Sequence, residues 1–141
     1  MEKVTVVFSA DLQVAVDILT EREPEMAAHF LKTLSDRPQV LVCNHPVSAG
    51  EMFDAYLRFP REPVQELKGA KPVSYTELEA GDVLWDGEKL SVVYGQVMQP
   101  GTAGYVIGKA DTSDAFQRGC LKIWNDFYRE HTVSTITITK E

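Results

Sequence analysis

The sequence has few cysteines and no recognisable export signal. Cys43 and Cys120 are the only two, and both lie in apolar stretches. The residues after Met1 already alternate as in a strand, without the charged and apolar regions of a secretory leader. Isolated thiols in such a chain usually behave as small buried apolar side chains. We therefore expect two free cysteines, no disulfide and a cytoplasmic protein.

Long apolar runs and clusters of positive charge are also missing. The longest apolar run, around residues 4–8, is far shorter than the ~20 residues of a membrane-spanning helix. The 14 Lys and Arg residues are scattered among 21 Asp and Glu residues, and the net charge is -7. Nucleic acids and anionic membranes both bind positive faces. We therefore expect that the protein binds neither nucleic acid nor a membrane.

Motifs for metals and phosphates are incomplete. Cys43 and His45 share one face of a predicted strand, but a closed zinc site has four ligands and no second pair is present. The glycines of "GQVMQPGTAG" are not followed by the Lys-Ser/Thr of a phosphate-binding loop. We expect no metal and no cofactor.

What is present is the composition of one ordinary globular domain. The chain has 141 residues, of which 44% are hydrophobic and 25% charged. A domain of this size buries roughly 68–70% of its unfolded surface, which allows a substantial core. No internal repeat or linker divides the chain. We expect a single domain covering residues 1–141.

Period-two alternation predicts most of the chain as strands. Leu12, Val14, Val16 and Ile18 share one parity, as in a strand with one buried face. Gly87 can adopt the positive φ of a hairpin turn. Residues 60–79 carry prolines and charges without any period and are predicted as a long loop. The predicted strands are residues 3–9, 12–19, 39–45, 51–59, 82–86, 89–97, 105–110 and 133–141.

Two segments have helical periodicity. The first begins after Thr20, which is predicted to cap it with Glu23 in a capping box, and ends near Asp36. The second spans residues 113–131, with a cap within residues 111–113. Gly119 inside it weakens the helix by ~1 kcal/mol relative to alanine, which indicates close packing against a neighbouring backbone.

The element order and two segments resemble a known family. The segments are "GDVLWDGEKLSVVYGQ" at 81–96 and "GYVIGKADTSDAF" at 104–116. They are similar to small cyclophilin-like proteins of bacteria and archaea, a group without an established activity. The resemblance extends over nearly the whole chain, and it implies a mainly β fold: a closed antiparallel β-barrel capped by two α-helices.

The same resemblance argues against prolyl isomerase activity. Cyclophilin isomerases carry a Phe-His-Arg segment whose arginine polarises the prolyl amide. The corresponding stretch here, "VLVCNHPVSAGEMFDAY" at 40–56, has His45 and no adjacent arginine. Arg58 and Arg61 lie further on, outside any matching context. Because a fold alone does not carry chemistry, prolyl isomerisation is only the third hypothesis.

Six residues are candidates for a site at the barrel mouth. His45 ends a predicted strand, and its ordinary pKa near ~6.5 suits proton transfer. Glu51 begins the next strand and is its candidate partner, although a lone histidine is commonly solvated or structural. The candidate ligand-binding residues are aromatic and could equally be core residues: Tyr56, Tyr94, Tyr105 and Trp124.

Two classes of function follow from these residues. In the first, a pocket at the barrel mouth binds a small molecule, and His45 and Glu51 hydrolyse or isomerise an amide, imide or lactam bond. This chemistry is implied only by analogy with cyclophilin-like modules found in enzymes that act on such bonds. In the second, the protein is a non-catalytic binding or self-assembly module, in which the outer surface of the barrel and its edge strands mediate self-association. The final strand, for example, could pair with a second copy through its edge. We expect a homo-oligomer.

Overall fold

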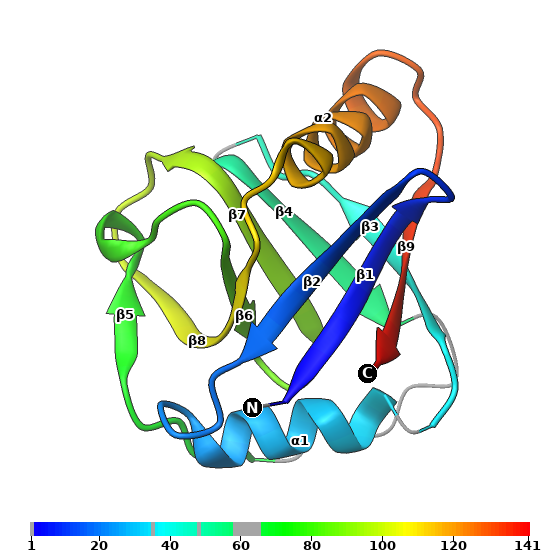
Figure 1. The fold of residues 1–141 in the computed structure, drawn as a ribbon. Helices are drawn as coiled ribbons and strands as arrows, with labels where there is room; N and C mark the ends of the chain where they lie inside the picture. Colours follow the sequence, from blue (N-terminus) through cyan, green and yellow to red (C-terminus); the bar gives the residue numbers. More distant parts are fainter. Residues whose placement is uncertain (1, 35, 48, 58–65) are drawn as a thin grey trace.

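The computed structural model describes residues 2–34, 36–47, 49–57 and 66–141 and shows a β-barrel with a helix at each end (Figure 1). The helices are α1, Pro24–Leu34, and α2, Asp114–Tyr128, and a single 3₁₀ turn, η1, covers Tyr75–Glu77. The strands of this described part are β1 Lys3–Ser9, β2 Leu12–Ile18, β3 Gln39–Asn44, β4 Gly50–Leu57, β5 Pro72–Ser74, β6 Asp82–Trp85, β7 Lys89–Val97, β8 Thr102–Ala110 and β9 Ser134–Lys140.

The strands close into a ring. Their order is β2-β1-β9-β3-β4-β7-β6-β8, and pairing of β2 with β8 completes the circle. β5 lies outside the ring and pairs with β8. All of these pairings are antiparallel, and closure leaves the ring without free edges. The predicted mainly β fold, a closed antiparallel barrel capped by two helices, is confirmed.

β9 is one of the strands of the ring and lies between β1 and β3. Ile138 of β9 is opposite Val6 of β1 on one side and opposite Gln39 of β3 on the other. Because both neighbours use the backbone groups of β9, a second copy cannot pair with it. The prediction of self-assembly through this strand's edge is therefore wrong, while the expected homo-oligomer stays a prediction.

The β6–β7 hairpin forms where the sequence predicts it. Gly87 has a φ of 99°, and the Asp86 carboxylate accepts the backbone N–H groups of Glu88 and Lys89 at 2.8 Å each. This turn places Trp85 opposite Leu90, and both side chains point into the core. Trp85 also donates from its indole nitrogen to His29 Nδ1 at 3.0 Å, which connects the hairpin to α1.

The start of α1 differs from the prediction. The helix begins at Pro24, so the predicted capping box of Thr20 and Glu23 is wrong. The carboxylate of Glu23 is fully buried and accepts the backbone N–H groups of Ala70 at 2.7 Å and Lys71 at 2.6 Å. Glu23 therefore fastens a segment distant in sequence to the start of the helix.

The second helix begins within the predicted cap region, and its glycine has a different neighbour. Ser113 accepts the N–H of Phe116 and caps α2. A Cβ added to Gly119 would lie 2.3 Å from the ring of Phe8. Close packing is confirmed, but the neighbour is a side chain of β1 and not a backbone. The absent side chain allows α2 to lie directly on the end of the barrel.

The predicted loop at residues 60–79 is partly structured. Residues 60–65 lie outside the described residues. In the remainder, β5 and η1 contradict the expectation of a segment without regular structure. Val73 of β5 packs in a second apolar cluster with Met52, Leu84 and Val93, whose side chains lie on the outer face of the barrel. This segment therefore covers part of the barrel's outside.

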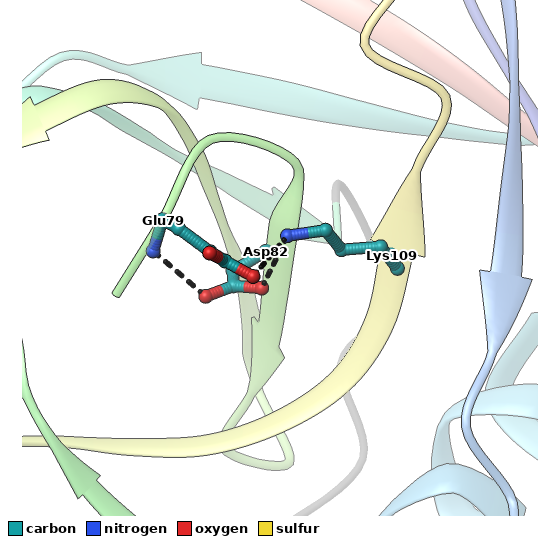
Figure 2. A network of polar contacts seen from close by, with 3 residues as sticks. All are labelled: Glu79, Asp82 and Lys109. Carbon is teal, nitrogen blue, oxygen red and sulfur yellow. Dashed lines mark hydrogen bonds and ion pairs between the residues drawn. The ribbon is translucent and has the colours of Figure 1, made fainter. Parts of the chain in front are cut away.

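An ion-pair network joins β6 to β8 (Figure 2). Lys109 Nζ lies 3.0 Å from a carboxylate oxygen of Glu79 and 3.1 Å from one of Asp82, and Asp82 also accepts the backbone N–H of Glu79 at 2.9 Å. Burial alone would lower the pKa of Lys109, but its hydrogen bonds to both carboxylates outweigh this effect and raise the pKa. Lys109 and the two carboxylates pair with one another, and these contacts hold the two strands together.

Candidate functional site

His45 is buried at the α2 end of the barrel. It directly follows β3, and its backbone carbonyl accepts a 2.6 Å hydrogen bond from the hydroxyl of Tyr128 on α2. Only 2% of His45 is exposed. Its Nε2 lies 2.7 Å from the hydroxyl of Tyr94 on β7, and its Nδ1 lies 3.3 Å from the carbonyl of Pro46. The structure thus brings together two of the predicted site residues, His45 and Tyr94.

The environment keeps both members of this pair neutral. Burial lowers the pKa of His45, and it is the largest of several effects that raise the pKa of Tyr94. Because the Pro46 carbonyl can only accept, its contact assigns the imidazole proton to Nδ1. Nε2 then accepts a hydrogen bond from the phenol of Tyr94. The pair is a neutral donor and acceptor in an apolar setting.

Aromatic residues of α2 cover this pair. The ring of Tyr128 packs edge-on against His45 at 5.4 Å between centroids, and Trp124 lies 5.7 Å from Tyr128. Trp124 is half-buried, and the guanidinium of Arg129 lies 5.4 Å from its ring centroid. Trp124 is therefore at the same end of the barrel as His45, and the ring of Tyr128 separates the two.

Glu51 lies near this end but has its own partner. It is exposed and occupies an irregularity between β4 and β7, where its carboxylate accepts the backbone N–H of Gln96 at 3.0 Å. Its charge contributes to the raised pKa of Tyr94. Its hydrogen bond is thus to the chain and not to His45, and a role as acid or base stays a prediction.

Tyr56 and Tyr105 do not join the same site. Phe53 and Ala55 of β4 point into the core, so alternation places Tyr56 on the outer face of the barrel. Tyr105 packs against the core, and its side chain lies beside Gly69. Gly69 precedes Ala70, whose N–H group is bonded to Glu23 at the start of α1. The expectation that all the aromatic candidates line one hollow is therefore wrong.

The barrel interior is too full for a ligand. It contains a cavity of about 20 Å³, close to the size of a single water molecule. The side chains around it are all apolar: Val4, Val6, Phe8, Val14, Val16, Ile18, Phe30, Val83, Leu90, Val92, Ala110, Phe116, Ile136 and Ile138. A small-molecule site must therefore lie at an end or on the outside of the barrel.

The two cysteines are free and buried, as predicted. Burial raises the pKa of the Cys43 thiol to about 12 and also raises that of Cys120, which lies on the buried face of α2. Both thiols are therefore poor nucleophiles at neutral pH. No group of three His, Cys, Asp or Glu residues that could hold a metal occurs among the residues that the structure describes.

A second polar cluster, missed by the sequence analysis, lies on the outer face of β4 and β7. We call Asp54, Tyr56, Lys89 and Ser91 the outer cluster. Ser91 donates to Asp54 Oδ1 at 2.6 Å, and Lys89 Nζ lies 3.7 Å from Asp54 Oδ2. Asp54 and Ser91 are 5% and 6% exposed. The sequence signal was an acidic residue in the middle of the otherwise apolar run "MFDAY".

Comparison with known proteins supports the fold and leaves the family open. No family model and no curated protein matches the sequence. Among solved structures, the chain is similar to McbB in complex with tryptophan, with a TM-score of 0.80 and 18% sequence identity. The likeness covers 96% of this chain but 44% of the McbB chain, so this chain spans less than half of the neighbour's length. At this identity, the similarity shows the barrel fold alone.

Within the described ranges, neither helix is long and apolar enough to cross a membrane.

Proposed function

We propose that this protein binds a small molecule at the α2 end of its barrel, beside the His45–Tyr94 pair, and acts there on an amide, imide or lactam bond. The observation that carries the proposal is the 2.7 Å contact between imidazole and phenol. Buried polar groups are costly, and perturbed titratable groups concentrate at functional sites. The nearby rings of Trp124 and Tyr128 supply the aromatic wall that ligand sites commonly have.

The neutral state of the pair suits a carbonyl ligand. Tyr94 keeps its proton and can donate a hydrogen bond to the carbonyl oxygen of an amide or imide. In hydrolysis, His45 Nε2, released from Tyr94, can then accept a proton from an attacking water as the C–O bond forms, and it can return this proton to the leaving nitrogen as the C–N bond breaks. In this proposal Glu51 acts as a second base from the exposed side. McbB, which shares the fold, has been solved with tryptophan, and this supports a small-molecule ligand in general terms.

Access to the pair requires a movement of Tyr128. Its ring and its hydrogen bond to the His45 carbonyl cover the imidazole. A net hydrogen bond contributes about 0.5–1.5 kcal/mol, so a ligand that supplies an equivalent contact can displace the tyrosine at small cost. Tyr128 would act as the cover of the site.

The proposal is tested by titrating the protein with succinimide, 2-pyrrolidinone and dihydrouracil in a calorimeter and following ring opening by absorbance. Saturable binding is expected. Tyr94→Phe should weaken it about tenfold, the equivalent of one hydrogen bond at about 1.4 kcal/mol. The matched control Tyr105→Phe makes the same change at the other end of the barrel and should leave the affinity unchanged.

Each result has a defined meaning. Binding without ring opening supports the non-catalytic alternative and removes the bond-breaking step. If no compound binds saturably, or if both tyrosine variants behave alike, the site is not at the α2 end.

A further inference from the structure

We propose that the outer cluster is a second site, which binds a small zwitterion of the α-amino-acid class. In this site the carboxylate of Asp54 receives the ligand's ammonium group, and the ammonium of Lys89 receives its carboxylate. Nothing in the α2-end proposal uses these residues. Three features of the outer cluster support this assignment: the geometry of the carboxylate, the charge beside it and the apolar side chains around both.

The first step is that Asp54 has unused hydrogen-bonding capacity. An ionised carboxylate can accept about four hydrogen bonds. Among the described residues, Asp54 accepts one, from Ser91, on Oδ1. Within the described ranges, its Oδ2 contacts Lys89 alone, at 3.7 Å, which is longer than a hydrogen bond of 2.7–3.2 Å. This oxygen is therefore available to a stronger donor.

The second step is that Oδ2 is open to solvent. In the described part of the chain, Arg22 Nε is the one buried side-chain polar atom that lacks a hydrogen-bond partner. Within the same described residues, Asp54 Oδ2 also lacks a hydrogen-bond partner, so it retains some contact with solvent although Asp54 as a whole is 5% exposed. A small part of the carboxylate is thus accessible from the outside of the barrel, beside Lys89, whose side chain is 35% exposed.

The third step is the fixed position of the opposite charge. Lys89 is two residues before Ser91 and therefore on the same face of β7, directly opposite Tyr56 of β4. Burial lowers the pKa of Lys89, but the charges of Asp54 and of neighbouring tyrosine and aspartate groups together outweigh this and raise it, so the side chain is charged. A carboxylate and an ammonium held close together without a full hydrogen bond match a ligand that carries both charges on one carbon.

The surroundings provide contacts for the rest of such a ligand. Tyr56 lies at the Lys89 end of the cluster, and Met52 and Val93 lie opposite each other at the Asp54 end. Met52 and Val93 belong to the apolar cluster on the outer face. A ligand with an apolar or aromatic side chain could pack on either side while its two charges pair with Asp54 and Lys89.

The test uses L-phenylalanine and two derivatives that each lack one charge, N-acetyl-L-phenylalanine and L-phenylalaninamide. Calorimetry on the full chain should show saturable binding of the free amino acid and at least tenfold weaker binding of each derivative. Asp54→Asn, which can still accept from Ser91, and Lys89→Gln should each weaken binding at least tenfold. The matched control Lys68→Gln removes the same charge from an exposed position and should have no effect.

The outcomes separate this site from the α2 end. If binding survives Asp54→Asn and Lys89→Gln but is lost in Tyr94→Phe, the amino acid occupies the α2 end and the inference is wrong. Absence of saturable binding, or equal binding of the N-acetyl derivative, also overturns it. Lys89→Gln decides the matter if Asp54→Asn fails to fold.

Discussion

Replacing Gly119 by alanine sets two physical effects against each other. Alanine is favoured over glycine inside a helix by ~1 kcal/mol, so helix propensity alone predicts a more stable protein. Packing predicts the reverse, because the new Cβ would lie 2.3, 2.5 and 2.7 Å from three atoms of the Phe8 ring. Carbon atoms in contact are normally about 3.5–4.0 Å apart. The ring must therefore move by more than an ångström.

The size of the loss follows from how tightly Phe8 is held. Phe8 is 6% exposed and packs edge-on against Phe53, with 6.3 Å between ring centroids. Overpacking of this kind costs about 1–3 kcal/mol, and a clash this close belongs at the upper end. After subtracting the gain in propensity, we expect the free energy of unfolding to fall by about 2 kcal/mol. For a chain of this length, this corresponds to a melting temperature lower by about 4–8 °C.

Urea unfolding followed by tryptophan fluorescence measures the change. Phe8→Leu combined with Gly119→Ala should cost less than the sum of the single variants, because the smaller side chain leaves room for the new methyl group. Leu121 lies on the same helix and is 51% exposed, so Leu121→Ala should change stability by less than about 0.5 kcal/mol. A Gly119→Ala protein as stable as the parent, or strictly additive costs, would refute the packing argument.

Two further predictions concern buried titratable groups. Glu23→Gln should lower stability by about 1–3 kcal/mol and speed hydrogen exchange at Ala70 and Lys71, because an amide turns its NH₂ towards one of their N–H groups. Glu25→Gln, in the exposed first turn, is the control, and unchanged protection at both amides would contradict the assignment. The second prediction is that stability falls as the pH drops below 6.5, because burial lowers the pKa of His45 and the unfolded chain takes up the proton first. The contribution of His45 to stability is complete above that pH, and below it the loss is at most about 1.4 kcal/mol per pH unit. His45→Gln should flatten the curve of unfolding free energy against pH between pH 6.5 and 5. Identical curves for the two proteins would show that His45 does not contribute.

The fold was accessible from the sequence because its signals are local. Alternation in β1 and β2, the turn at Gly87 and the apolar stripe of α2 each involve residues close together in the chain. The start of α1 was not accessible in this way. Its decisive contact joins Glu23 to Ala70 and Lys71, and no local pattern reports a contact over such a separation.

The candidate site was predicted in part for the same reason. Tyr94 shares its parity with the apolar Leu90 and Val92, which indicates that its side chain points inward, and its contact with His45 follows from the ring order of β3, β4 and β7. The parity of Tyr56 could not be interpreted without knowing which face of β4 is the core. The outer cluster needed the pairing of Asp54 with Ser91, which depends on the alignment of two strands.

The position of β9 between β1 and β3 has a consequence for biosynthesis. A nascent chain cannot close the circle until residues 134–140 have left the ribosomal exit tunnel, because those residues supply the hydrogen bonds that both neighbours lack. Until then the emerging polypeptide exposes the unpaired edges of β1 and β3, which favour aggregation. Closure of the barrel therefore waits for the synthesis of β9, and a chain truncated before residue 134 should remain open and depend on chaperones.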